Sequence, residues 1–454
     1  MNSSRMFRNL KSSEKLLLCL WKTPKLCRTL LSQAYQCQEA WNKRLQSPLL
    51  QKIKPVDFFL ELDHKFQTQS RVSAVDIDIF SNSITNNSQI QELEDLLYKL
   101  RMSRETTFTL DSTHHAVVRF FLETGQAEQL LDVLNDRLNY GIFCDYFCYN
   151  ILMDHFIEKG KFGLAAKTAS LMMLQEEYKH PISNALAIYS CHKYLENADS
   201  WQEVDPETLK DPEPKEEVKI RVHYLRNPYF DDHFDLWKPS DLTGKTLYLI
   251  GQTMYDPLGR TCQLRGLLLY RKLIDAIALL KKWKQEGVKE VVYRDVLPLI
   301  KKDVPEIFGE EASDEAKELQ QLLPDSETAN LHQGNLETDI ENLAKTAIDT
   351  YSQEDIDKQI KIYNEWEEKR MTVLKENLAE LDRQARLAKI EQIKQELAEQ
   401  EQVLTFFENE DKIELTIEQK LEKEKKIFGE ESEVVQNLDE NYVPPEIVRK
   451  RENQ

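Results

Sequence analysis

Two glycines 35 residues apart, Gly125 and Gly160, each interrupt a stretch in which apolar residues recur at helical spacing. A glycine at such a point can adopt the left-handed backbone conformation that ends a helix. The chain of 454 residues contains only 12 glycines and 15 prolines, so few tight turns are available to it. This scarcity favours helices with short connections over sheets. The spacing therefore predicts a repeated helix–turn–helix unit and an all-α fold.

The window 146–180 carries the pattern most clearly. Tyr149 and Asn150 open its first helix, Gly160 ends that helix, and the small Ala165 lets the second helix approach closely. Apolar residues of the first helix follow spacings of three and four, which places them on one face. Four residues are therefore expected to line the interior of the hairpin: Tyr149, Leu152, Phe156 and Ala165.

The preceding window, 111–145, has Gly125 at the same position and ends in Gly141 and Asp145. Asp145 can cap the helix that follows. These features resemble the pentatricopeptide repeat, a helix–turn–helix unit of the same length with a Tyr-Asn start and a Gly-x-x-Pro-Asp ending. Cys144 stands where that ending has proline, so the terminal turn is less rigid. The flanking windows match more weakly, and the resemblance implies a short, degenerate α-hairpin solenoid.

The same resemblance implies candidate RNA-binding residues. In pentatricopeptide proteins the fifth and last residues of each repeat read one base, and here these would be His115 with Asp145 and Asn150 with His180. Two readable windows are too few to specify a transcript. A free RNA-processing or RNA-stability factor in mitochondria nevertheless stays open as the alternative function.

Residues 1–38 contain seven Lys and Arg residues against a single acid, Glu14. A basic, serine-containing and acid-poor start is typical of a mitochondrial transit peptide, so import into the matrix is expected. The longest apolar run, LLLCLW, is too short to cross a bilayer, so no membrane span is predicted. A secretory signal is a weaker interpretation, and a basic arm that stays on the protein remains open.

The apparent chemical motifs lead to no predicted active site. Cys144 and Cys148 lack the second ligand pair of a zinc finger, so no metal is expected and the cysteines are interpreted as reduced packing residues. The Gly244-Lys245-Thr246 stretch lacks the glycine that opens a phosphate loop. The 231–233 stretch (Asp-Asp-His) suggests capping or a salt bridge rather than metal binding. We therefore predict no enzyme activity, no cofactor and no small-molecule substrate.

The most basic stretch after residue 38 is 260–302, with 11 Lys and Arg residues against four acids. One helix is expected over 263–284 within it. Basic side chains on a helix can neutralise RNA phosphates without reading bases, although they can also merely solvate its outer face. The candidates for RNA binding in this stretch are Arg260, Arg265, Arg271, Lys272, Lys281, Lys282 and Lys284.

Charge divides the rest of the chain. Residues 301–454 carry 21 basic and 40 acidic side chains, which is the whole net charge of −19, while 1–300 are neutral. Leu374, Leu378 and Leu381 begin a narrow apolar stripe that suggests a coiled coil, with a single solvated helix as the alternative. The expected segments are a transit peptide at 1–38, a repeat array at 39–200, a linker at 201–218, a basic helical block at 219–302, an acidic disordered linker at 303–350, a long charged helix at 351–428 and a tail at 429–454.

The order of these parts adds a second resemblance. A basic leader, LLSQAYQCQEAW at 30–41, the hairpins, RNPYFDDHFDLWKPSDLTGKTL at 226–247 and a charged helix with YNEWEEKR at 363–370 follow one another. Together they resemble the S27 family of mitochondrial small-subunit ribosomal proteins. The resemblance implies a helical-repeat scaffold that binds small-subunit rRNA and other mitochondrial ribosomal proteins, without catalysis.

Overall fold

The computed structural model describes residues 29–197, 201, 231–304, 314–323 and 331–436, and it divides into two units, residues 1–373 and 374–454. Within the described residues every regular element is a helix, and the one β-type contact is an isolated bridge between Tyr293 and His332. The all-α prediction is confirmed. None of these helices combines the length and apolar character needed to cross a bilayer.

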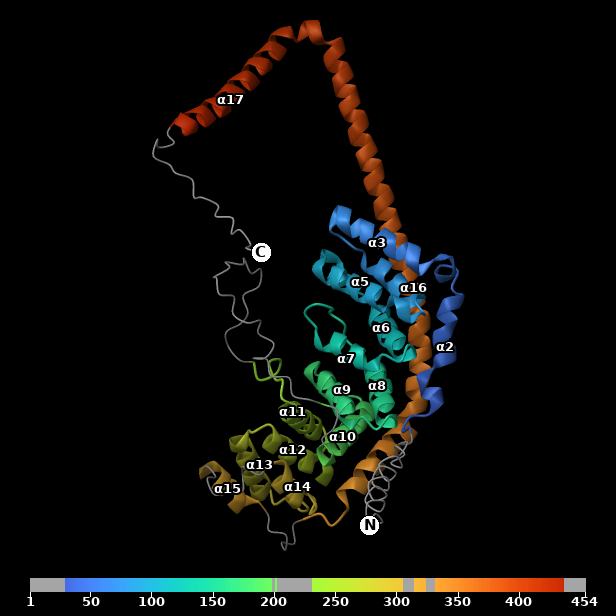
Figure 1. The fold of residues 1–454 in the computed structure, drawn as a ribbon, viewed down its shortest axis with the longest axis vertical. Coiled ribbons are helices and arrows are strands. Elements are labelled where there is room, and N and C mark those ends of the chain that lie inside the picture. The colour runs from blue at the N-terminus through green and yellow to red at the C-terminus, as the bar shows by residue number, and fades with distance from the viewer. Residues whose placement is uncertain (1–28, 198–200, 202–230, 305–313, 324–330, 437–454) are drawn as a thin grey trace, which may run out of the picture. The chain divides into compact units, whose positions relative to one another are not determined.

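The centre of the first unit is a stack of helical hairpins (Figure 1). One side of the stack is built from α4 (Ala74–Ser83), α6 (Asp111–Glu123), α8 (Tyr146–Glu158) and α10 (Pro181–Glu196). The second helices of the hairpins are α5 (Ile90–Met102), α7 (Ala127–Asn135) and α9 (Phe162–Leu174). Helices α6, α8 and α10 begin at residues 111, 146 and 181, so the 35-residue spacing of the sequence is the spacing of the hairpins.

The turns of these hairpins form as their residues predict. Gly125, Gly141 and Gly160 have φ angles of 76°, 62° and 68°, in the left-handed region where a side chain would be strained. The Asp145 carboxylate accepts a 2.7 Å hydrogen bond from the backbone N–H of Cys148 and so caps α8. The predicted interior of the hairpin is confirmed, because four side chains are at most 1% exposed: Tyr149, Leu152, Phe156 and Ala165.

Helices α11 (Pro239–Gln252) and α12 (Pro257–Leu269) pack against each other at unusually short range. Gly244 and Gly251 of α11 lie against Gly266 and Gly259 of α12, and a Cβ atom on Gly266 would come within 2.5 Å of the Gly244 carbonyl oxygen. Only glycine permits this approach. Gly244 therefore serves helix packing inside a helix, in agreement with the rejection of a phosphate loop at 244–246.

The expected single helix over 263–284 is wrong. The chain forms α12 and then α13 (Leu273–Gln285), and Arg271 between them adopts a left-handed conformation with φ 61°. Because this residue is not glycine, no local signal marks the turn. Helix α13 packs with α14 (Val296–Asp303) and α15 (Asp314–Leu322) around a second apolar cluster that includes Leu280, Trp283 and Leu319.

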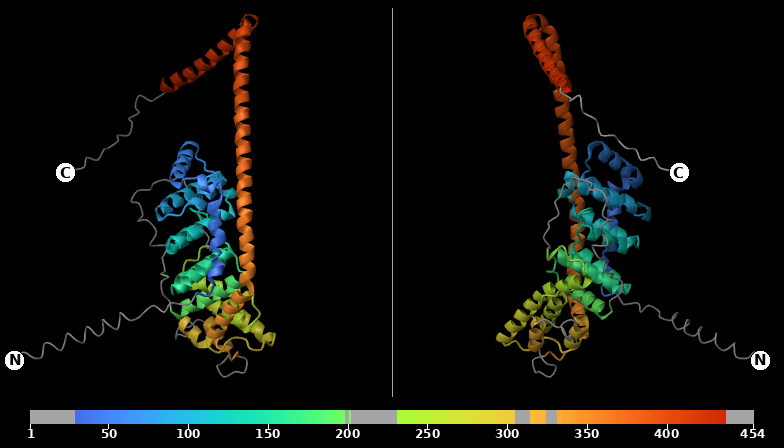
Figure 2. Two further views of the ribbon diagram at one scale, coloured as in Figure 1. Left: turned by 90° about the vertical axis from the view of Figure 1, so that its right-hand side faces the viewer. Right: turned by 60° about the vertical axis from the view of Figure 1, so that its left-hand side comes forward.

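The long helix α16 (Leu336–Leu404) begins in the first unit and, up to residue 373, runs beside the stacked hairpins (Figures 1 and 2). Its first turns are buried at Leu336, Ile340, Ala344 and Ala347. The expectation of a disordered linker over 303–350 is therefore wrong for the described residues of that range. Residues 305–313 and 324–330 lie outside the description.

The segment before the array is also folded. It contains η1 (Gln33–Gln36), α2 (Gln38–Asn42), η2 (Lys43–Gln46) and η3 (Leu50–Lys52), followed by α3 (Pro55–Gln69). Leu31, Tyr35 and Cys37 are buried in the main core. A transit peptide that extends to residue 38 is thus inconsistent with the fold, while residues 1–28 lie outside the described residues, as does the expected linker apart from Trp201.

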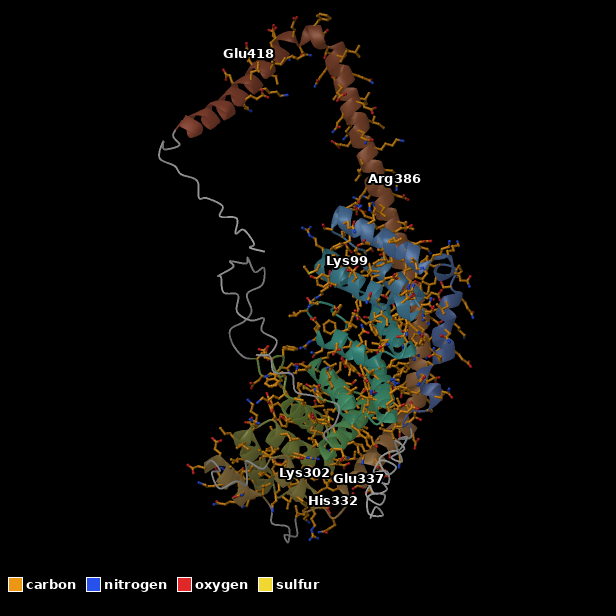
Figure 3. All side chains as sticks on the ribbon, in the orientation of Figure 1. Lys99, Lys302, His332, Glu337, Arg386 and Glu418 are labelled. Carbon is orange, nitrogen blue, oxygen red and sulfur yellow. The ribbon has the colours of Figure 1, made fainter. Side chains whose placement is uncertain are left out.

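The second unit starts at Leu374. It contains the remainder of α16, the short η7 (Phe406–Glu408) and α17 (Glu410–Gln436), so the expected continuous helix over 351–428 is interrupted near residue 405. Leu378, Leu381 and Leu397 are 54–60% exposed. Charged side chains such as Arg386 and Glu418 surround both helices, as Figure 3 shows. Residues 437–454 lie outside the description.

Candidate nucleic-acid interface

The polar residues proposed to read RNA bases lie on the face of the array that α16 and the N-terminal segment cover. His115 is 1% exposed and Asn150 is fully buried. Both side chains are therefore out of reach of solvent, and their assignment as RNA contacts is a correction that the structure imposes. The partners proposed with them are partly exposed, with the Asp145 side chain 36% and the His180 side chain 19% exposed, and each is bonded within the fold, Asp145 to the Cys148 N–H and His180 to Asp355.

Asn150 and His180 are joined through the N-terminal segment and α16. The Asn150 amide Nδ2 donates a 2.9 Å hydrogen bond to the Tyr35 hydroxyl, which in turn donates to Asp355 Oδ2 at 2.9 Å. His180 Nε2 lies 3.0 Å from Asp355 Oδ1. Burial and the Asp355 carboxylate raise the pKa of Tyr35, so its hydroxyl keeps its proton as a donor. The Asp355 carboxylate of α16 thus contacts His180 directly and Asn150 through the Tyr35 hydroxyl.

His115 contacts two aromatic residues of α16. Its Nε2 is 3.0 Å from the Tyr363 hydroxyl, its Nδ1 is 3.1 Å from Cys148 Sγ, and Trp366 lies against its ring. Burial lowers the pKa of His115, so the imidazole is neutral at physiological pH. The side chain is fully occupied within the chain.

His115, Asp145 and Cys148 place three atoms of metal-ligand type within 4.8 Å of one another. Each has a partner within the protein: the thiol contacts His115, and the Asp145 carboxylate caps α8. Burial raises the pKa of the Cys148 thiol well above its usual range, which disfavours the thiolate that a metal needs. The cluster is accounted for as a hydrogen-bonded core, and no metal is needed to explain it.

A third contact joins α16 to the first hairpin of the array. Arg370 of α16 forms an ion pair with Asp78 of α4, and the two side chains are 5% and 0% exposed. Asp78 Oδ1 also accepts hydrogen bonds from Ser112 and Thr113 of α6. A buried charge pair with additional hydrogen bonds to its carboxylate satisfies the condition under which such pairs are tolerated in a protein interior.

The basic candidates of the 260–302 stretch divide by burial. Arg265 is 1% exposed, with Nε donating to Asp303 at 2.7 Å and Nη1 to His192 Nδ1 at 2.7 Å. Burial and this guanidinium hold the pKa of His192 well below its usual range, so the imidazole accepts as a neutral base. Arg265 is a structural residue and its assignment as an RNA contact is wrong in this conformation.

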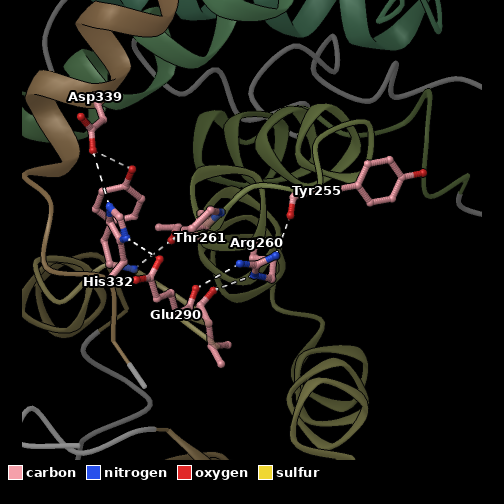
Figure 4. A network of polar contacts seen from close by, with 9 residues as sticks. Tyr255, Arg260, Thr261, Glu290, His332 and Asp339 are labelled. Atoms are coloured by element: carbon pink, nitrogen blue, oxygen red, sulfur yellow. Dashed lines mark hydrogen bonds and ion pairs between the residues drawn. The ribbon is translucent and has the colours of Figure 1, made fainter. Parts of the chain in front are cut away.

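Arg260 is also engaged in the fold. Its guanidinium donates to the backbone carbonyls of Tyr255, Glu290 and Val291, at the edge of the polar network drawn in Figure 4. In the same network Thr261 accepts from the Tyr293 N–H, while Glu290 and Asp339 contact His332. Arg260 therefore fixes a loop, with one N–H from each of its three nitrogens bonded to a backbone oxygen.

The other basic candidates lie at the surface around α13. Lys272 pairs with Asp232 at 2.7 Å, Lys281 with Glu318 at 2.7 Å, and Lys282 with Glu286 at 4.0 Å. The neighbouring Asp231 accepts from the His233 N–H at 2.6 Å, so the 231–233 stretch forms a cap and a salt bridge, as expected. Arg271 and Lys284 are exposed, and no acidic partner is found for either among the described residues.

With this geometry in place, the family of the chain is decided by its match to a family model. The model of mitochondrial 28S ribosomal protein S27 matches residues 1–396. The chain belongs to this family. It is accordingly a mitochondrial protein of the small ribosomal subunit, associated with the ribosome and its proteins. The match spans the whole first unit and ends inside α16, before α17 begins.

Sequence reasoning misses the residues of α16 that cover the inner face of the helical array. Asp355, Tyr363 and Arg370 lie in a segment whose composition indicates a solvated charged helix. A signal exists, because Asp355, Gln359, Tyr363, Trp366 and Arg370 follow steps of four, four, three and four and so share one face. A search for apolar residues at helical spacing does not detect this pattern, because three of the five residues are charged or amide side chains.

Proposed function

We propose that this S27-family chain is a structural constituent of the small subunit in the mitochondrial matrix, a helical scaffold that binds rRNA phosphates and neighbouring ribosomal proteins without catalysing a reaction. The observation that supports it most is the distribution of cationic groups. Buried ones hold the fold together, whereas those around α13 face solvent.

The surface around α13 is the best supported site for rRNA. Arg271, Lys281, Lys282 and Lys284 are all exposed within about four helical turns. Exposed ion pairs such as Lys281–Glu318 contribute little to stability, so their lysines can exchange a carboxylate for a phosphate at small cost. Contacts of this kind depend on charge and position and carry no base sequence.

The alternative of a free RNA-processing factor is disfavoured by the same structure. A base-reading array needs its code residues free to donate to and accept from bases. His115 and Asn150, the two fifth-position residues, are buried against Tyr363 and Tyr35. We therefore assign no transcript-specific role to the array.

Binding to small-subunit rRNA fragments across a salt series tests the rRNA contact. Replacing Arg271, Lys281, Lys282 and Lys284 by glutamine should weaken binding and flatten the slope of log K against log salt by somewhat under one unit per true phosphate contact. The matched control replaces four exposed cations of the second unit, Lys375, Arg386, Lys389 and Lys394, which changes the net charge equally. An unchanged slope in the first variant, or an equal loss in the control, would contradict the assignment.

A further inference from the structure

Helix α16 contacts the inner face of the array in a regular register. Arg370 contacts Asp78 of α4, and Tyr363 contacts His115 of α6. Asp355 reaches Asn150 of α8 through the Tyr35 hydroxyl. The order along α16 is the reverse of the order of the helices, so α16 runs back along the stack and contributes one polar residue for each of three successive helices.

The spacing of these residues matches the spacing of the stack. Asp355 and Tyr363 are eight residues apart, and Tyr363 and Arg370 seven. At about 1.5 Å of rise per residue these intervals span about 12 and 10 Å. Neighbouring packed helices lie about 8–10 Å apart, so one helix of this pitch can meet each of them in turn.

The contacted residues occupy equivalent positions in their helices. Asp78, His115 and Asn150 are each the fifth residue of α4, α6 and α8, counted from Ala74, Asp111 and Tyr146. All three are at most 1% exposed. Asp78 and Arg370 form a buried ion pair, so withdrawing either one would leave the other as an uncompensated charge in the interior. The contact is therefore a polar seam, formed by Asp355, Tyr363 and Arg370 of α16, in which each polar group has a specific partner.

We propose that residues 355–370 of α16 are an internal ligand of the helical array, which permanently occupies the inner face of α4, α6 and α8 and leaves it closed to single-stranded nucleic acid. This inference rests on the proposed function only in placing the rRNA contact elsewhere, on the outer, basic surface. It adds that RNA binding by this chain is independent of base identity. The N-terminal segment completes the closure through Tyr35 and Trp41, which packs against His115 and Tyr363.

The test uses the full chain and single-stranded 20-nucleotide probes of uridine, cytidine and adenosine. Hydrogen exchange of residues 351–373 is followed with and without each probe, and binding is measured for the wild type and for the double variant His115→Asn, Asn150→Asp. The closed face predicts that no probe changes the exchange of 351–373. It also predicts that the double variant alters the ratio of affinities among probes by less than twofold, although its melting temperature falls. Faster exchange on adding a probe, or a tenfold change in base preference, would overturn the proposal.

A milder variant keeps the test decisive if the double variant does not fold. Tyr363→Phe removes only the hydroxyl that contacts His115, so α16 is loosened without losing its ring packing. If the inner face bound RNA whenever α16 opened, this variant would gain affinity for the probes in proportion to its faster exchange. The proposal expects faster exchange with unchanged affinity. Binding of structured rRNA fragments is measured in parallel, so that loss of the rRNA contact, which concerns the proposed function, is recorded separately from opening of the inner face.

Discussion

Arg370 and Asp78, 292 positions apart in the sequence, form a buried ion pair that ties α16 to the first hairpin of the array. The pair closes the first unit at the end opposite to the buried start of α16 at Leu336 and Ile340. Because Asp78 also accepts from side chains of α6, three helices depend on one carboxylate.

Replacing Arg370 by methionine is expected to destabilise the first unit by about 3–5 kcal/mol, because Asp78 is left as an uncompensated buried charge. Urea denaturation measures the loss. The control is Arg383→Met, whose side chain is 70% exposed beside Glu380, and a change within about 0.5 kcal/mol is expected there. A loss in the Arg370 variant no greater than in this control would show that the pair is not closed in solution.

The short distance between α11 and α12 predicts the sign of the stability change when a glycine between them is replaced. In an ordinary helix interior, replacing glycine by alanine stabilises by about 0.5–1 kcal/mol. At Gly266 the added Cβ would meet the Gly244 carbonyl oxygen at 2.5 Å and the Tyr248 backbone nitrogen at 2.6 Å, and neither can move without shifting α11. Gly266→Ala should therefore lower the melting temperature, and a rise would mean that α11 and α12 are further apart.

How far the fold could be predicted depends on how local its causes are. The hairpins were predictable because Gly125, Gly160 and Asp145 act on their own turns. The apolar stripe of Leu336, Ile340 and Ala344 follows helical spacing, but it is short and lies among acidic residues, so the sequence predicts disorder over 303–350. The left-handed turn at Arg271 has no sequence signal, so the sequence predicts one continuous helix where α12 and α13 are separate.

The candidate site was harder to predict for a physical reason. Asn150 and His115 are polar residues at the positions where related repeats read bases, so local pattern suggests exposure. Their burial depends on partners about 115 and 248 residues away, Tyr35 and Tyr363, whose own surroundings in the sequence are polar. The spacing of Asp355, Tyr363 and Arg370 marks one face of α16, but nothing in a single sequence says that the inner face of the array is the surface it meets.

A buried carboxylate makes stability depend on pH. Asp154 Oδ1 accepts from the backbone N–H groups of Leu30 and Leu31, at 2.8 and 3.2 Å, and burial raises the pKa of Asp154 to about 6. The folded state therefore binds this proton more tightly than the unfolded chain, whose aspartates titrate near 3.9. The contribution of Asp154 to stability is greatest below about pH 4 and is lost as the pH rises to about 6.

Asp154→Asn removes this titration and keeps an oxygen that can accept from Leu30 and Leu31. Relative to the wild type, the variant should become more stable between about pH 4 and 6 and then hold a constant difference up to pH 8. Denaturation midpoints of both proteins at one-unit intervals provide the measurement. A difference that is flat across that range, or that falls with pH, would contradict the raised pKa.

The same hydrogen bonds limit where a leader can be removed. We expect a mitochondrial import peptide within the first 29 residues or so, because Leu30 and Leu31 bond to Asp154 and Leu31 is buried. N-terminal sequencing of the protein isolated from mitochondria should find a start later than Met1 and no later than Leu31. An intact Met1, or a start beyond Leu31, would contradict this placement.

We propose that the chain works as a fixed part of the small ribosomal subunit, with the inner face of its array covered by its own helix α16. Sedimentation of mitochondrial ribosomal subunits, probed for this chain, tests it most directly, with the Arg271, Lys281, Lys282 and Lys284 variant run beside the wild type. We expect the wild type to migrate with the small subunit and the variant to shift towards the top of the gradient as salt is raised. Wild-type protein found only at the top, free of subunits at low salt, would contradict it.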